Sequence, residues 1–470
     1  MHKTLSIVIS IILAGISAAQ LDPAEQVARD VKNGNAMTDL AYLSDMIGPR
    51  LTGSVNLAKA QKWAVQKMKE YGGENVHMES YTFPSRWERG HDDHLHMLTQ
   101  SKRDMTVHAM PWNPPTKGLI TADAALLEGP IDELLKNTDR FKGKIVVLGR
   151  IFPPKNGGDP QKIEVQVHKA IGKKALAYLL SEEHIDGKFT MYGSPDDSYF
   201  TDYFGGWPRL PFGFLIVEDR SMLVRLLRKG QKVRLQLKLG GRITKAPVIE
   251  HNVVGEIKGS EMPNEVVLIG GHLDSWDLGT GTTDNGTGSI ATLEALRVLK
   301  KLGVRPKRTI RFVLFSGEEQ GSYGAEAYVK KHKAELSNFQ AVLIHDIGAG
   351  KPTGFTVQGY SQWVPLLREA MAPLGKIGVL EVPIERHWDS DQDAFVRAGV
   401  PGFFLDQDIT DYFASTHHSQ TDTMSHVKPA EYLPSVQAFA TVAWNFANME
   451  QRVPHVPPGN TVGPDKDKAE

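Results

Sequence analysis

From His251 onward, strand-like and helix-like segments alternate along the chain, and this alternation constrains the fold more than any other feature. The apolar, β-rich runs are residues 266–269, 309–315, 341–344 and 402–405. The stretches with a helical pattern are residues 289–302 and 322–331. Short β-rich runs separated by helices are typical of a mainly parallel sheet that is covered on both faces. The sequence therefore predicts an α/β fold with three layers, αβα, around a mainly parallel, mixed sheet.

Breaks rich in Pro and Gly divide the remainder of the chain. Residues 20–116 are expected to form the N-terminal part of the α/β unit, which residues 246–450 complete. Residues 117–245 are predicted to be a separate, inserted, β-rich domain. Within it, strands are expected at residues 144–148 and 232–239 and a helix at residues 170–180. Residues 451–470 are Pro-rich and charged, which predicts a disordered tail.

The first 19 residues have the pattern of a secretory signal peptide. Lys3 precedes an apolar run over residues 5–16, and Ser17, Ala18 and Ala19 offer a cleavage site. The run is shorter than the ~20 apolar residues that span a bilayer, which disfavours an uncleaved anchor. We therefore expect a secreted protein, periplasmic or extracellular, with no membrane attachment after cleavage.

Composition narrows the partners and the chemistry. The 470 residues include 54 Lys+Arg and 55 Asp+Glu, a net charge of -1, which argues against a nucleic-acid binder that relies on a basic surface. Small molecules or peptides are the expected partners. The chain contains no Cys, so thiolate zinc sites and Cys nucleophiles are excluded, and any metal must be held by nitrogen and oxygen.

Five acidic and imidazole residues follow the apolar runs or the turns after them. They are His272, Asp284, Glu319, Asp346 and His418. Because the carboxyl ends of parallel strands meet at one edge of an α/β sheet, these distant residues are expected to converge. Three carboxylates and two imidazoles form a ligand set suited to two divalent metals that share one bridging carboxylate.

Each motif, taken alone, has a plainer interpretation. In GGHLDSWD, Asp274 is spaced to orient the ring of His272, but a His satisfied by a loop Asp has the same pattern. Asp284 lies in the Gly-rich GTGTTDNGTG, where an N-cap or a plain turn is the alternative. A phosphate loop is disfavoured because neither a Walker Lys nor GxGxxG after a strand is present. Asp346 follows an apolar strand directly, where an unpaired acid is costly.

Glu318 and Glu319 are adjacent at the end of a strand. Two carboxylates at a semi-buried rim repel each other unless cations neutralise them or one binds a proton. This suggests that Glu319 binds a metal while Glu318 is the general base toward a metal-bound water. A solvated acidic turn is the alternative.

The motif THHSQTDT offers two imidazoles. We take His418 as the ligand because Asp422 is spaced to orient it, and His417 is the competing choice. A second cluster, His91, His94 and His96, has no acid spaced to complete a metal site and is expected to lie on a surface strand.

Across residues 265–426 these motifs, together with SDQDAF and AGVPG, resemble in order the family of co-catalytic zinc aminopeptidases and glutamate carboxypeptidases, with its carboxypeptidase Q branch the more similar. The resemblance implies a zinc exopeptidase fold, two Zn²⁺ per chain and short peptides or dipeptides as substrates. It also implies that residues 117–245 are a protease-associated domain and that the protein is a homodimer. Aminopeptidase activity is the alternative, and a glutaminyl cyclase or a non-catalytic binding protein are distant ones.

The resemblance also assigns roles. It implies that His272 and Asp346 hold one zinc and that Glu319 and His418 hold the other. Asp284 bridges the two, and Glu318 is the general base. Asp274 corresponds to a supporting acid, and Asp391 corresponds to an Asp near the substrate. HDIG at residues 345–348 departs from the more acidic run of carboxypeptidase Q, so specificity does not carry over with the motifs.

Overall fold

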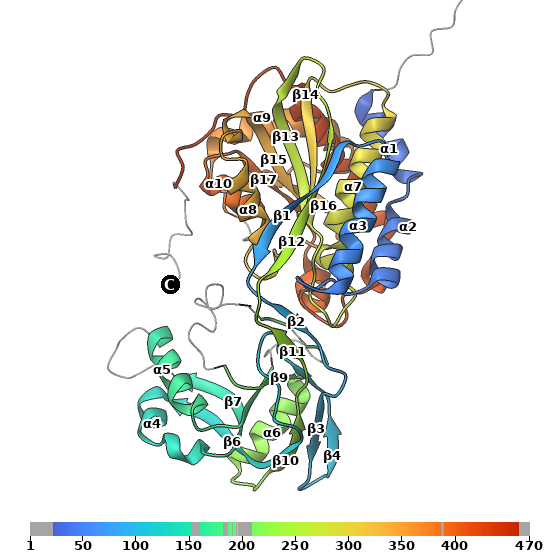
Figure 1. Cartoon of the computed structure of the whole chain (residues 1–470). Helices are drawn as coiled ribbons and strands as arrows, with labels where there is room; N and C mark the ends of the chain where they lie inside the picture. Colours follow the sequence, from blue (N-terminus) through green and yellow to red (C-terminus); the bar gives the residue numbers. More distant parts are fainter. Residues whose placement is uncertain are drawn as a thin grey trace, which may run out of the picture.

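The computed structural model describes residues 22–152, 160–181, 187–189, 191–193, 195, 209–386 and 390–459. The predicted signal peptide lies outside these residues, as do residues 460–470 of the predicted tail. Two lobes are evident in Figure 1, a larger one that contains both the N-terminal helices and the C-terminal half, and a smaller one built from the middle of the chain. In the part of the chain described, no helix combines the length and apolar character needed to cross a membrane.

A seven-stranded sheet forms the centre of the larger lobe. In spatial order its strands are β1 (Glu74–Phe83), β12 (Val248–Ile257), β14 (Arg308–Phe315), β13 (Met262–His272), β15 (Phe339–Ile344), β17 (Gly402–Gln407) and β16 (Pro352–Thr356). Strands β14, β13, β15 and β17 are parallel to one another. Strands β1, β12 and β16 pair antiparallel. The predicted mainly parallel, mixed sheet is therefore confirmed.

Helices cover both faces of this sheet. One face packs against α1 (Pro23–Lys32), α2 (Ala36–Ala41), α3 (Val55–Glu70), α7 (Thr287–Lys301), α9 (Val364–Met371) and α11 (Pro429–Asn448), and the other against α8 (Tyr323–Lys331) and α10 (Gln392–Arg397). Alternate side chains of β13 point to opposite faces of the sheet and pack in two different hydrophobic cores. Val267 and Ile269 belong to one core, and Val266 and Leu268 belong to the other. Each such buried aliphatic side chain contributes about 1.5–3 kcal/mol. The three-layer prediction is confirmed.

The smaller lobe contains an eight-stranded sheet. Its order is β4 (Arg103–Met105), β3 (His94–Met97), β10 (Arg234–Lys238), β6 (Ile120–Pro130), β7 (Ile145–Phe152), β8 (Ala177–Leu180), β9 (Phe212–Leu215) and β5 (Val107–Ala109). The helices α4 (Ile131–Lys136), α5 (Pro160–Gly172) and α6 (Val217–Arg228) accompany it. At the waist between the lobes, β2 (Arg86–Glu88) pairs with β11 (Arg242–Thr244) (Figure 1).

Two sequence expectations need correction in this lobe. Strands β3, β4 and β5 all precede residue 117, so the predicted boundary there cuts through the sheet. The Pro-rich segment that suggested a boundary is packed, with Trp112 only 2% exposed. The helix predicted at residues 170–180 is wrong, because α5 ends at Gly172 and β8 follows as a strand between β7 and β9. A buried parallel strand is apolar throughout, so periodicity does not separate it from a buried helix.

The prediction of disorder is wrong for residues 451–459. Val453 and Val456 are buried, and the backbone N–H of Val456 donates to the carbonyl of Gly399 at 3.0 Å. The indole N–H of Trp363 donates to the Pro454 carbonyl at 2.8 Å. These residues have no helical or strand-like periodicity from which an ordered structure could be predicted. Contacts with distant parts of the chain hold them in place.

Candidate metal centre

His272 and Asp346 leave neighbouring parallel strands and meet at the rim of the sheet. His272 is the last residue of β13, and Asp346 lies two residues after β15. Their Nε2 and Oδ1 atoms are 2.9 Å apart. On the other side of the ring, Nδ1 is 3.0 Å from the carbonyl oxygen of Asp274. A proton on Nδ1 donates to that carbonyl and leaves the Nε2 lone pair facing the carboxylates, as in metal-binding His residues.

Asp284 lies between the two imidazoles. Its Oδ1 is 3.5 Å from Nε2 of His272, and its Oδ2 is 3.6 Å from Nε2 of His418. His272, Asp284 and Asp346 each offer a ligand atom within 4.8 Å of the others. The Gly-rich segment can pack this closely against the residues that follow β15 because Gly288 has no side chain. A Cβ at this position would be only 2.0 Å from the carbonyl oxygen of His345. One carboxylate thus presents a separate oxygen to each half of the site, as a bridging ligand does.

The adjacent glutamates face the two imidazoles separately. Glu319 Oε2 is 3.0 Å from Nε2 of His418, and Glu318 Oε2 is 3.9 Å from Nε2 of His272. Gly317, with φ +75°, makes the turn that places them there. Burial raises the pKa of Glu319 well above its usual range, and the charge of Asp284 adds to the rise. Burial likewise raises the pKa of Glu318, against the opposing effect of His272. A bound cation would relieve this concentration of negative charge.

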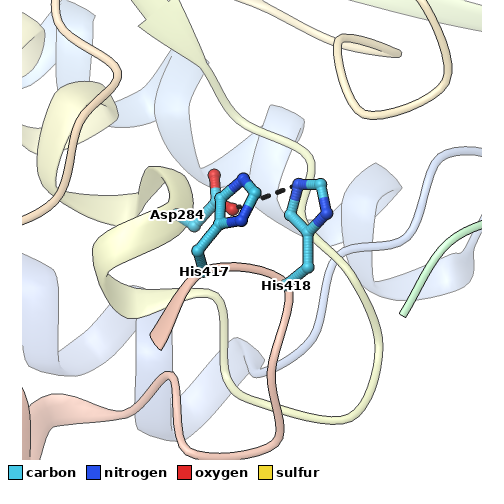
Figure 2. A group of neighbouring side chains, drawn as sticks. All are labelled: Asp284, His417 and His418. Carbon is cyan, nitrogen blue, oxygen red and sulfur yellow. Dashed lines mark ion pairs between the residues drawn. The ribbon is translucent and has the colours of Figure 1, made fainter. Parts of the chain in front are cut away.

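His417 and His418 stack on each other, with ring centroids 3.8 Å apart (Figure 2). The dashed line in Figure 2 marks the ion pair between His418 and Asp284. Asp284, His417 and His418 also form a group whose ligand atoms lie within 4.8 Å. Burial beside His418 lowers the pKa of His417 to about 3, so its ring is neutral and able to bind metal. His417 therefore stays an alternative ligand, although only His418 pairs with Glu319.

Asp274 connects two of the loops that form the site. Thr52 Oγ1 donates to Asp274 Oδ2 at 2.9 Å, and the N–H groups of Glu318 and Glu319 approach the same carboxylate at 3.4 Å. The Asp274 carboxylate is 3.6 Å from Nδ1 of His272, so its carbonyl makes the closer contact with the ring. Asp274 therefore joins the His272 loop to the glutamate turn.

Asp422, which we expected to orient His418, supports the loop of Asp284. Its Oδ1 accepts from the backbone N–H of Thr283 at 2.6 Å and from the hydroxyl of Thr283 at 2.8 Å. Its Oδ2 accepts from the backbone N–H of Asp284 at 3.1 Å. Asp422 therefore acts on the bridging residue.

Several buried carboxylate oxygens accept no hydrogen bond from the residues that the structure describes. They are Oδ2 of Asp284, both oxygens of Glu319 and both oxygens of Asp391. Burying a carboxylate without donors is costly, and a cation removes that cost. Carboxylate oxygens and imidazole nitrogens at this spacing are suitable ligands for Zn²⁺. Asp391 itself is fully buried, and burial raises its pKa well above the usual range.

Arg50 is a part of the site that was not predicted from the sequence. Its guanidinium is buried and donates to the carbonyl oxygens of Leu273 at 2.6 Å, Thr280 at 2.9 Å and Gly281 at 2.6 Å. Burial lowers the pKa of Arg50 to about 10, while the nearby acids, Asp422 first among them, oppose the decrease. A fixed positive charge thus lies behind the ligand loops. No local sequence signal identifies it, because its partners in these loops, Leu273, Thr280 and Gly281, are more than 220 positions away.

Comparison with known proteins identifies the family. A model of peptidase family M28 matches residues 252–443. Carboxypeptidase Q of Mus musculus is 35% identical over 418 residues, which cover 88% of this chain and 86% of that protein. The chain belongs to peptidase family M28. A crystal structure of a peptidase M28 precursor from Shewanella amazonensis SB2B is 27% identical with a TM-score of 0.77, covering 93% of this chain and 98% of that one.

Membership of family M28 confirms that the protein is a metallopeptidase, an exopeptidase rather than a binding protein. A zinc aminopeptidase from Bacillus subtilis has the same fold, with a TM-score of 0.64 at 22% identity over 87% of this chain and 93% of that one. The zinc exopeptidase fold predicted from the motifs is thereby confirmed. The M28 match also includes all five predicted ligand positions, since residues 252–443 contain them.

Proposed function

We propose that this M28 member is a secreted, dinuclear zinc exopeptidase. His272 and Asp346 hold one zinc, and Glu319 and His418 hold the other. Asp284 bridges them. The observation that carries this proposal is the placement of Asp284, whose two oxygens face different imidazoles at 3.5 and 3.6 Å.

Glu318 is the proton carrier in the proposed reaction. Zinc bound at the site supplies a Lewis acid that polarises the peptide carbonyl and makes a water molecule acidic near neutral pH. The Glu318 carboxylate accepts the proton from the attacking water and returns it to the leaving amine. Asp274 supports this function because its carboxylate lies 3.4 Å from the backbone nitrogen of Glu318. Asp391 lies near the substrate.

The proposed substrates are short peptides or dipeptides, cleaved as by carboxypeptidase Q, to which the chain is 35% identical. Aminopeptidase activity is the second candidate, favoured by the shared fold with the zinc aminopeptidase of Bacillus subtilis. A panel of dipeptides with either terminus blocked separates them. A carboxypeptidase or dipeptidase requires the free carboxylate, so blocking the C-terminus should abolish turnover. Loss of turnover only on N-terminal blocking would identify an aminopeptidase.

The choice of His418 over His417 is tested by a matched pair of variants. His418→Ala should reduce bound zinc from two ions per chain toward one, measured by atomic emission. His417→Ala removes the neighbouring ring, which stacks at 3.8 Å, and should leave two ions bound. The reverse result would transfer the ligand role to His417.

We also propose that the smaller lobe is the inserted protease-associated domain, extended to include β3, β4 and β5. The sheet topology supports this, because these strands join the strands of residues 117–245 in one sheet. Expression with and without residues 1–19, followed by fractionation, tests the proposed secretion.

A further inference from the structure

A segment of the smaller lobe contacts the loop that carries His418. We call residues 187–189 and 191–193 the strap, and residues 414–420 the His418 loop. The strap is anchored in its own lobe, since Phe189 and Met191 are buried in the core of the smaller lobe. Phe189 also packs edge-on against His108, with ring centroids 4.7 Å apart.

Four hydrogen bonds join the strap to the His418 loop. The N–H of Met191 donates to the carbonyl oxygen of His418 at 2.8 Å. Gln420 accepts from the N–H of Phe189 at 2.8 Å and donates to the carbonyl of Gly187 at 3.0 Å. Lys188 Nζ donates to the carbonyl of Ala414 at 2.6 Å. The strap therefore holds the loop on both sides of His418 and at His418 itself.

The conformation of His418 requires such support. Its φ is +52°, in the left-handed region that a non-glycine residue rarely occupies without external contacts. The ring of Tyr192, from the strap, packs edge-on against the His418 ring at 5.0 Å, and Trp276 packs against it at 5.7 Å. The His418 ring is thus fixed by aromatic residues of both lobes.

A second junction keeps the lobes together near the site. Arg89 makes a bidentate ion pair with Asp277, the last residue of GGHLDSWD, at 2.7 and 2.9 Å. Trp112 packs edge-on against Trp276 at 6.5 Å. The loop after β13 and the His418 loop therefore both contact the smaller lobe.

We propose that the strap is a positioning element for the metal site, and that the smaller lobe sets the zinc affinity of the half that contains His418 and Glu319. This inference rests on the proposed role of His418 as a zinc ligand. The half that contains His272 and Asp346 is built on β13 and β15, and none of the four strap hydrogen bonds reaches it. The direct hydrogen bonds of the strap are therefore confined to the half that contains His418.

The test is the double variant Lys188→Met/Gln420→Ala, which removes three of the four hydrogen bonds and leaves every proposed ligand in place. The control is Lys144→Met/Gln100→Ala in the same lobe, where the partners are Asp123 and the Lys232 carbonyl. Zinc affinity is measured by competition with a chromophoric chelator. Loss of supporting hydrogen bonds should weaken the second equivalent of zinc by about 10- to 100-fold while the first changes less than about twofold. The control should bind both equivalents as the parent does.

Hydrogen exchange gives a readout independent of zinc. The amides of Phe189 and Met191 should be protected in the parent protein and exchange faster in the strap variant, but not in the control. Parent-like affinity for both zinc ions in the strap variant, with His418→Ala losing one ion, would overturn the strap's role alone. Two zinc ions retained in His418→Ala would overturn the proposed ligand set itself.

Discussion

The carboxylate of Asp422 accepts a hydrogen bond from the backbone N–H of Asp284 at 3.1 Å, although the two residues are 138 positions apart in the sequence. Its other oxygen accepts from the backbone and hydroxyl of Thr283. Asp422 thus ties the segment that follows His418 to the loop that carries the proposed bridging ligand. A displacement of this carboxylate should affect both proposed zinc sites, because Asp284 is the proposed bridge between them.

Asp422→Asn tests this relationship. An amide group replaces one of the accepting oxygens, so either Thr283 or Asp284 loses its acceptor. Zinc affinity should fall by about 10- to 100-fold for both equivalents, measured by chelator competition. Asp411→Asn, an exposed acid paired with His426, is the control and should bind zinc normally. Unchanged affinity in Asp422→Asn would show that Asp284 holds its position without this contact.

Glu318→Ala separates catalysis from metal binding. The carboxylate lies 3.9 Å from His272 but has no assigned zinc. Turnover of the preferred dipeptide should fall by about 10²- to 10⁴-fold, as expected for loss of a general base. Zinc content by atomic emission should stay at the parent value. Glu326→Ala, which alters an exposed glutamate on α8, should leave turnover unchanged. Undiminished turnover in Glu318→Ala would exclude Glu318 as the base.

The sequence predicted the larger lobe and the convergence of the ligands because both follow from local patterns. His272, Glu319 and Asp346 lie at or just after the ends of β13, β14 and β15. Because these strands are parallel, their carboxyl ends bring the three residues to one edge of the sheet. The smaller lobe was predicted less well, since its short strands β3 and β5 pair with β10 and β9, more than 100 positions away. Arg50 and the strap were missed for the same physical reason. Their contacts are made largely with backbone carbonyls and amides, and such contacts cannot be predicted from the pattern of side chains in the sequence.

Arg50→Lys tests the buried cation behind the ligand loops. Lysine keeps the charge but cannot reach all the carbonyl oxygens that the guanidinium contacts, which include Leu273, Thr280 and Gly281. The free energy of unfolding of the zinc-free protein should fall by about 2–5 kcal/mol, measured by urea denaturation. Arg305→Lys, at an exposed pair with Glu74, should change it little. Equal stability of the two variants would contradict a structural role for Arg50.

Glu79 predicts a pH-dependent part of the stability. Burial alone would raise its pKa, but contacts with His332 at 3.0 Å, His77 at 3.1 Å and Lys331 at 3.3 Å outweigh burial and lower it to about 2. Because the folded pKa lies below the ordinary 4.5, this stabilisation is present above pH 4.5 and is lost as the pH falls toward 2. Glu79→Gln should therefore cost about 1–2 kcal/mol at pH 6 and progressively less at pH 4 and pH 3.

The control for this pH dependence is Glu335→Gln. Glu335 contacts the other nitrogen of His332 at 3.3 Å and is exposed. Urea denaturation of this variant should give a difference from the parent near zero at each pH. A deficit in Glu79→Gln that is the same at pH 6 and pH 3 would contradict the assignment, because an uncharged role of the side chain does not titrate.

In the proposed metal centre, Asp284 joins two zinc ions. This bridging role can be tested with an anomalous difference map, recorded at the zinc absorption edge from crystals of the zinc-loaded protein. We expect two peaks about 3.5–4 Å apart, one on each side of the Asp284 carboxylate. One should contact His272 and Asp346, and the other Glu319 and His418. A single peak would exclude Asp284 as a bridge between two zinc ions, and a second peak bound to His417 in place of His418 would exclude His418 as a ligand.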